Sequence, residues 1–107
     1  MASSKEFVAF VEEQLSVLGE IKTRPMLGGY LLYFRGKLVG DICDNRLLVK
    51  PVPAALELLP NAPLEPPYEG AKDMLLVEEL DNRELLCRLL PAMYDQLPEP
   101  KKRKPKK

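Results

Sequence analysis

The side chains that carry out nucleophilic and acid–base chemistry are sparse in this chain. It contains no histidine, and its hydroxyl groups other than tyrosine all lie on or beside the first predicted helix, at Ser3, Ser4, Ser16 and Thr23. A nucleophile needs an adjacent base, and acid–base catalysis needs carboxylates that converge in a pocket. The acidic residues instead occur in short runs typical of a solvated surface, at Glu12, Glu13, Glu78, Glu79, Asp41 and Asp44. The sequence therefore predicts a non-enzymatic protein with no catalytic residues.

Residues that could form a metal site or a phosphate site are equally scarce. Cys43 and Cys87 are far apart and form no CxxC pair, whereas the usual zinc sites take four nitrogen or sulfur ligands. We expect both cysteines to be buried apolar fillers. The pair Gly28 and Gly29 lacks the further glycine, the lysine and the following helix of a phosphate loop. We therefore predict no cofactor and no metal, and we expect these glycines to allow a sharp entry into a strand or close packing.

Charge is unevenly distributed along the chain. All sixteen acidic residues lie at or before Glu99, so residues 1–100 carry ten basic and sixteen acidic side chains, a net charge of −6. Six of the last seven residues are basic, and they are candidate nucleic-acid contacts: Lys101, Lys102, Arg103, Lys104, Lys106 and Lys107. A tail of this kind adds nonspecific attraction to nucleic acid or is a solubilising end.

Length and composition favour one domain followed by this tail. The 107 residues are 46% hydrophobic, which is enough for a modest core. We predict a folded domain over residues 1–97 and a disordered basic tail over residues 98–107. No window contains eighteen apolar residues and no signal-peptide core is present, so we expect a cytoplasmic protein.

Hydrophobic spacing predicts the elements that would hold any site. Residues 4–18 have a helical stripe, opened by a capping box of Ser3 with Glu6 and ended by Gly19. Strands are expected at residues 30–34, 37–43 and 46–50, separated by turns at Arg35–Gly36 and Asp44–Asn45. A short helical turn should follow at residues 54–59, with a fourth strand at 74–77 and a less regular strand around Tyr68.

A second helix is predicted to begin at a capping box of Asp81 with Glu84, with a kink or restart at Pro91. The predicted fold class is α+β, a two-layer structure. An antiparallel sheet of about four to five strands is covered on one face by an N-terminal and a C-terminal helix.

Aromatic and basic residues around the first strands offer a candidate recognition surface. Tyr30, Tyr33 and Phe34 lie near Arg24, Arg35 and Lys37, as in platforms that stack single-stranded bases. Strand alternation divides the rings between two faces, which favours core packing for one set. The outer face would then carry Tyr33 or Tyr30 with Val39 and Leu48, which indicates a dimer or partner surface.

The segment from Arg24 to Tyr33 resembles the N-terminal domain of the TfoX/Sxy competence regulators. The family motif is matched by Arg24, Met26, Gly28, Gly29, Tyr30, Leu32, Tyr33 and Gly36, whereas Pro25, Leu27 and Leu31 depart from it. The resemblance implies the fold and a role in transcriptional regulation through protein contacts. We expect an unknown protein partner, with a homodimer as one form, no membrane, and nonspecific nucleic-acid binding by the tail as the alternative function. The longer segment from Thr23 to Ile42 is also interpreted as a structural hinge between the first helix and the sheet.

Overall fold

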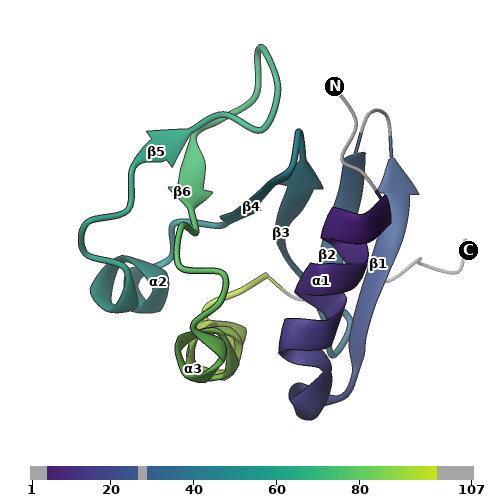
Figure 1. Ribbon diagram of the computed structural model, residues 1–107. Helices are drawn as coiled ribbons and strands as arrows, with labels where there is room; N and C mark the ends of the chain where they lie inside the picture. Colours follow the sequence, from purple (N-terminus) through teal and green to yellow (C-terminus); the bar gives the residue numbers. More distant parts are fainter. Residues whose placement is uncertain (1–4, 27–28, 99–107) are drawn as a thin grey trace, which may run out of the picture.

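The computed structural model describes residues 5–26 and 29–98, in which three α-helices pack on a six-stranded antiparallel sheet (Figure 1). The predicted α+β fold is confirmed, with six strands rather than four to five. The elements in chain order are α1 (Lys5–Leu15), the 3₁₀ turn η1 (Ser16–Leu18), β1 (Ile21–Met26), β2 (Gly29–Phe34), β3 (Lys37–Cys43), β4 (Arg46–Val49), α2 (Pro53–Leu58), β5 (Leu64–Glu65), β6 (Met74–Leu76) and α3 (Arg83–Tyr94).

The strand order is β1-β2-β3-β4-β6-β5, so the first four strands form a meander. Both predicted reversals are present: the backbone is left-handed at Arg35 and Gly36 (φ 53° and 84°) and at Asp44 and Asn45 (φ 54° at each). Two consecutive left-handed residues match the right-handed twist of antiparallel strands. The two turns therefore place β2, β3 and β4 side by side.

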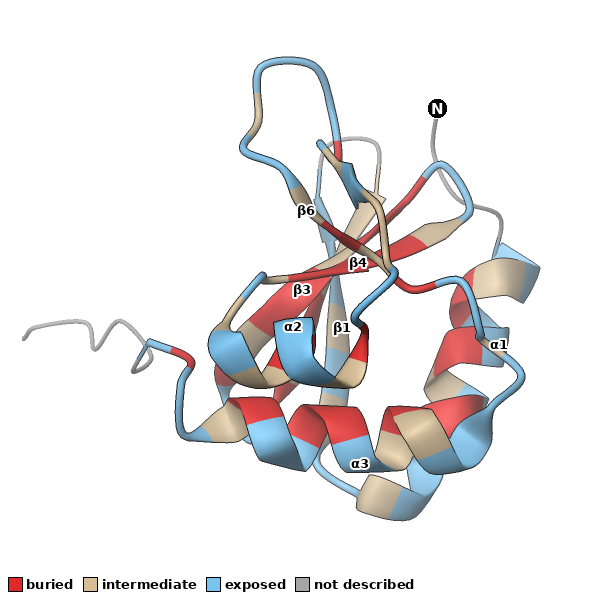
Figure 2. Ribbon diagram, turned by 90° about the vertical axis from the view of Figure 1, so that its left-hand side faces the viewer, coloured by how far each residue is buried: buried red, intermediate tan, exposed pale blue. Residues whose placement is uncertain are grey.

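The helices cover one face of the sheet and bury the core against it. Buried side chains of α1 and α3, such as Val11, Leu15 and Leu89, join buried strand residues in a single cluster. Figure 2 shows the buried side of α3 turned toward the sheet. The Thr23 hydroxyl on β1 donates a hydrogen bond to Glu12 Oε2 on α1 at 2.6 Å. Thr23 therefore marks the helix-covered face of the first strand.

The hinge interpretation is wrong for residues 23–26, because they belong to the edge strand β1. Pairing runs from Ile21 opposite Phe34 to Met26 opposite Gly29. The apolar alternation that marks a strand is missing here, since the only large apolar side chains of β1 are those of Ile21 and Met26 at its two ends. Pro25 is tolerated because an edge strand has a hydrogen-bonding side with no partner strand.

Val39 lies in the core, which corrects its predicted place on the outer face. The pairing of β2 with β3 shifts register between Leu32 and Tyr33, and such a β-bulge reverses the alternation of side chains beyond it. Val39 and Ile42 consequently both join the core cluster although three positions separate them. Sequence periodicity does not reveal a bulge.

Three smaller expectations also change. The strand predicted near Tyr68 lies earlier, at Leu64–Glu65. Asn82 rather than Asp81 caps α3, because its side-chain oxygen accepts a hydrogen bond from the Leu85 N–H at 3.1 Å. α3 continues through Pro91 without a restart; Pro91 is on the exposed side of the helix, where water can bond the carbonyl that proline leaves free.

Two further expectations cannot be compared with the structure. The capping box of Ser3 with Glu6 and the disorder of the basic tail both involve residues outside the described ranges. Within those ranges, no helix has both the length and the apolar character needed to cross a membrane.

Candidate functional site

The helix-free face of the sheet is the main candidate surface. Because Thr23 points toward α1, its neighbours Lys22, Arg24 and Met26 point to the opposite side. The strand register extends this side across the sheet. We call it the open face and define it by Lys22, Arg24, Met26, Leu31, Tyr33, Leu38 and Asp41.

The open face is partly apolar and partly accessible. Leu31, Tyr33 and Leu38 are half-buried, and Met26 on the edge strand is 42% exposed. Tyr33 rather than Tyr30 occupies this face, because Tyr30 packs against the core cluster. No described helix covers these side chains, so the prediction of an apolar outer face is confirmed for Tyr33.

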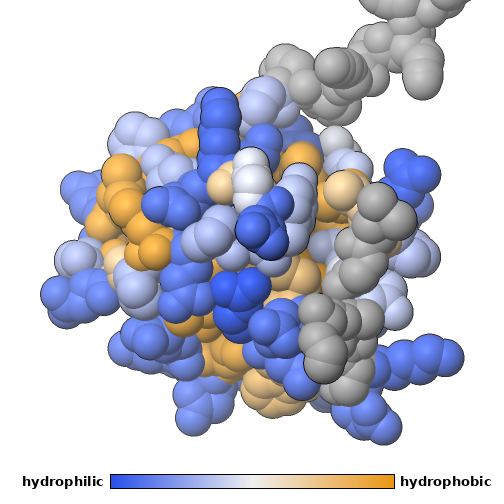
Figure 3. Space-filling view, turned by 90° about the horizontal axis from the view of Figure 1, so that it is seen from above, coloured by the Kyte–Doolittle hydropathy of each residue, from blue (hydrophilic) through white to orange (hydrophobic). Residues whose placement is uncertain are grey.

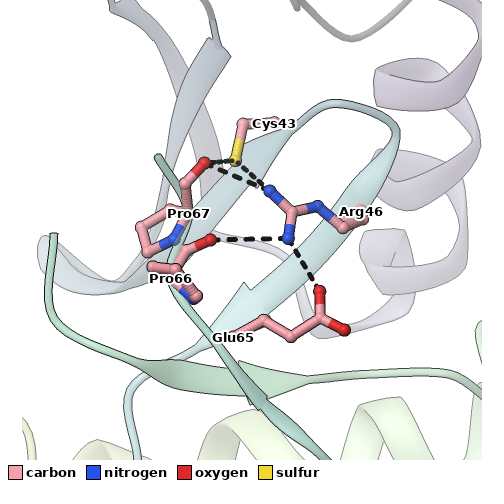
Figure 4. Close-up of polar contacts among 5 residues, drawn as sticks. All are labelled: Cys43, Arg46, Glu65, Pro66 and Pro67. Carbon is pink, nitrogen blue, oxygen red and sulfur yellow. Dashed lines mark hydrogen bonds and ion pairs between the residues drawn. The ribbon is translucent and has the colours of Figure 1, made fainter. Parts of the chain in front are cut away.

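Leu48, also expected on the outer face, is fully buried. It lies outside the helix-side core cluster, so another part of the chain must cover it. Figure 4 shows that residues 65–67, which comprise the last residue of β5 and the two prolines after it, lie against the β3–β4 hairpin. Since Arg46 and Leu48 lie two positions apart on the same side of β4, we infer that this segment covers the β3–β4 half of the outer face and leaves the β1–β2 half open.

Arg46 holds that segment in place through a cluster of contacts (Figure 4). Its Nη1 forms an ion pair with Glu65 Oε1 at 2.8 Å and donates to the Pro66 carbonyl oxygen at 3.4 Å. Its Nη2 donates to the Pro67 carbonyl oxygen at 3.2 Å. The Arg46 Nε atom is buried without a hydrogen-bond partner. A guanidinium suits this position because its fixed fork can bond several acceptors at once.

Cys43 belongs to the same cluster; it is buried, as predicted, but its thiol forms a hydrogen bond and so is more than an apolar filler. Its thiol donates to the Pro67 carbonyl oxygen, with Sγ 2.9 Å away. Burial raises the pKa of the Cys43 thiol, and the nearby Arg46 guanidinium only partly offsets this effect. A thiol with a raised pKa is a poor nucleophile. Cys87, which is only half-buried, lies with its Sγ 3.8 Å from the Gln14 carbonyl oxygen.

Asp41 places a carboxylate in the middle of the outer face, opposite Leu31 on β2 and Leu48 on β4. Partial burial raises the pKa of the Asp41 carboxyl, and the charge of Lys50 acts in the opposite direction. A charge among apolar side chains lowers the stability of the free domain. It also restricts which partners can cover this face.

A groove lies where β1 and β2 meet the end of α3. It has a volume of about 1010 Å³ and is lined by Lys22, Arg24, Tyr33, Arg35 and Tyr94 among others. We call these five residues the basic groove. Glu20, the acidic residue of the lining, forms an ion pair with Arg35 at 2.8 Å. The groove therefore has an excess of positive charge.

The predicted aromatic platform is only partly assembled. Tyr33 lies near Arg24 and Arg35, whereas Phe34 is buried in the core and Tyr30 packs against it. The Lys37 side chain is buried, with Nζ 3.0 Å from the Tyr94 carbonyl oxygen and 4.2 Å from the centre of its ring. Strand alternation thus divides the three rings between the two faces, as predicted.

Two members of the groove were missed from the sequence. Lys22 lies on β1, whose sequence has no apolar alternation to mark it as a strand, so no local pattern places it beside Tyr33. Tyr94 lies 61 positions after Tyr33 (94 − 33), and no local pattern indicates that the two residues meet.

The family-motif residues have different structural roles. Leu32 is fully buried in the core, while Met26, Tyr33 and Arg24 lie on the open face. Gly36 forms the β2–β3 turn, and Gly28 lies outside the described residues. A Cβ atom at Gly29 would lie 2.7 Å from the Ile42 carbonyl oxygen, so close packing of β2 against β3 explains this glycine.

The described residues contain no group of three or more cysteine, histidine or acidic side chains placed to hold a metal ion. From above, hydrophobic residues appear as separate small patches among hydrophilic ones (Figure 3). Among the described residues, the open face and the basic groove each combine accessibility with a distinctive chemical character.

Comparison with known proteins gives two matches. A family model described as the TfoX N-terminal domain matches residues 13–97. A protein of Spirochaeta aurantia described as "Uncharacterized 12.7 kDa protein in trpE 5'region" is 39% identical over 110 residues, covering 99% of this chain and 93% of that protein. No solved structure gives a significant match.

Proposed function

We propose that this chain, which belongs to the TfoX N-terminal domain family, is a non-enzymatic protein-interaction module with a regulatory role in the cytoplasm. The resemblance to competence and transcription regulators supports the regulatory part of this proposal. The surfaces of the folded domain support the interaction part. Its scarce catalytic side chains favour binding over chemistry.

The observation that carries the proposal is the uncovered, partly apolar open face. Leu31, Tyr33 and Leu38 lie side by side on β2 and β3 and have no described helix over them. An accessible apolar patch next to charged residues is typical of protein–protein contact sites. The adjacent Leu48 is fully buried within the domain itself, so the β1–β2 half is left for another molecule.

The sheet edges are less suited to binding a partner. β5 has only two residues, and β1 has Pro25 near its end. Short edge strands and prolines are the devices by which proteins prevent strand addition. A partner therefore binds through the open face rather than by extending the sheet, and a second copy of the chain is the first partner to test.

The test compares the binding of the double variant Leu31→Ser/Leu38→Ser with that of a control variant, Leu64→Ser. Leu64 is an accessible leucine on β5, away from the open face. Light scattering at micromolar concentrations reports self-association, and affinity capture from the protein's own lysate reports other partners. We expect the double variant to lose a dimer or a retained partner that the wild type and the control keep, with circular dichroism confirming the fold. A wild-type monomer that retains no protein more strongly than the double variant would overturn the proposal.

Nucleic-acid binding through the basic tail is the second candidate function. The observation that favours it is the concentration of six basic residues in the last seven positions. Counterion release predicts that the affinity falls steeply as salt rises. Deletion of residues 101–107 should then abolish or greatly weaken binding to DNA or RNA at low salt, whereas unchanged binding would exclude the tail.

A further inference from the structure

The basic groove has a local charge opposite to that of the domain around it. Residues 1–100 carry a net charge of −6, yet three of their ten basic side chains, Lys22, Arg24 and Arg35, line this groove. Glu20 neutralises Arg35, whereas Lys22 and Arg24 have no ion pair within the described part of the chain. Unpaired cations in a concave site attract anions.

The spacing of these two cations suits a ligand with repeated charges. Lys22 and Arg24 are exposed and lie two positions apart on the same side of β1. Such positions are separated by about 6.8 Å along an antiparallel strand. Each side chain can therefore contact a different anionic group of one extended chain.

An aromatic ring lies between these charges and the centre of the sheet. Tyr33 is half-exposed and pairs directly with Lys22 across the two strands. A tyrosine on an open antiparallel sheet, next to basic side chains, is the arrangement on which proteins stack unpaired bases. An acidic protein segment would use the two cations but would have no base to stack on the ring.

The basic tail begins only a few positions after a groove residue in the sequence. Lys101 follows Tyr94, a groove residue, by seven positions, a distance of at most about 25 Å along the chain. Groove and tail are therefore close enough to bind the same polyanion, and the second contact then gains from a high effective concentration.

We propose that the basic groove binds single-stranded nucleic acid, with Lys22 and Arg24 contacting phosphates and Tyr33 stacking on a base. This inference rests on the second candidate function, because it adds a contact within the folded domain to the contact made by the tail. The groove shares Lys22, Arg24 and Tyr33 with the open face, but the inference does not require the protein-interaction proposal to hold.

The experiment measures fluorescence anisotropy of labelled dT20 and rU20 with the full chain between 50 and 200 mM salt. Lys22→Glu/Arg24→Glu should reduce the affinity at least tenfold and lower the slope of log affinity against log salt by about 1.4, since each phosphate contact to a single strand contributes about 0.7. Tyr33→Ala should reduce the affinity about fivefold or more and leave the slope unchanged. The charge-matched control Lys5→Glu/Lys72→Glu should change both quantities much less.

Three results would overturn the inference. The first is an equal loss of affinity in the groove variant and in the control. If deletion of residues 101–107 nevertheless abolished binding, the result would support binding by the tail alone. Another is equal binding of poly-L-glutamate together with no effect of Tyr33→Ala, which would indicate an acidic protein segment as the ligand. The third is the absence of binding at 50 mM salt. Lys22→Gln/Arg24→Gln provides a second test if the charge reversal disturbs folding.

Discussion

Arg46 and Cys43 face each other across the β3–β4 hairpin, and both side chains bond the Pro67 carbonyl oxygen, from Arg46 Nη2 at 3.2 Å and from Cys43 Sγ at 2.9 Å. This shared acceptor holds the segment after β5 across the outer side of β4. It explains why Leu48 is fully buried on a face that no described helix covers. The contact therefore sets the boundary of the open face.

Replacing Arg46 should destabilise the domain. Arg46→Met removes the ion pair with Glu65 and two hydrogen bonds to carbonyl oxygens, and it leaves partly buried acceptors unpaired. We expect the free energy of unfolding, measured by urea denaturation, to fall by about 2 kcal/mol.

The matched control is Arg88→Met. Arg88 pairs with Glu84 at 3.7 Å on the exposed side of α3, and an ion pair of this kind contributes about 0.5 kcal/mol or less. Equal losses for the two variants would show that Arg46 does not anchor the segment.

Gly40 should tolerate no side chain. A Cβ atom there would lie 1.9 Å from the Leu48 carbonyl oxygen and 2.8 Å from the Val49 Cα, and both are backbone atoms that cannot move aside. Gly40→Ala should therefore cost about 3 kcal/mol or more, or prevent folding.

Gly19→Ala serves as the comparison for Gly40→Ala. Gly19 has φ of 65° and ψ of 175°, a combination that is essentially restricted to glycine, and a Cβ atom added there would meet no other atom within 4 Å, so only backbone strain of about 1 to 3 kcal/mol is expected. Thermal melts of the two variants distinguish the cost of the steric clash at Gly40 from the cost of backbone strain at Gly19. Similar losses would mean that β3 and β4 can move apart at Gly40.

Much of this architecture follows from local sequence patterns. The stripe of α1, the two left-handed turns and the apolar run of β6 all depend on neighbouring residues, and all three are present. β1 was missed because an edge strand with one exposed face lacks the apolar alternation of β2. Val39 was misplaced because a bulge depends on pairing between strands.

The candidate surfaces likewise include features that follow from local sequence and features that depend on contacts between distant segments. Tyr33 was placed on the outer face by alternation within one strand. The basic groove includes Tyr94, which lies on α3 far along the sequence from β1 and β2. The cover over Leu48 depends on contacts of Arg46 with Pro66 and Pro67. Such contacts between distant segments are set by tertiary packing and leave no periodic signal.

Pro25 should protect the β1 edge against pairing with other chains. Its partner on β2 is Tyr30, and proline has no N–H to offer on the outward side. Pro25→Val supplies that donor and a residue that favours strands. We expect sedimentation velocity to show concentration-dependent oligomers for the variant beyond any formed by the wild type. Unchanged sedimentation would mean that another feature protects this edge.

Asp41 should make stability depend on pH in a definite direction. Burial raises the pKa of the Asp41 carboxyl above its ordinary value of 3.8, so the folded protein binds more protons than the unfolded chain between the two values. Stability due to this group therefore falls as the pH rises through that interval, and the loss is complete above the folded-state pKa.

Asp41→Asn removes this cost. We expect its Tm to exceed that of the wild type at pH 7 and the difference to vanish as the pH falls below about 3.8, where Asp41 is protonated in both states. Asp73→Asn, at an exposed position, controls for the loss of one negative charge. A lower Tm for Asp41→Asn at pH 7 would show instead that attraction to Lys50 outweighs the cost of burying the carboxylate.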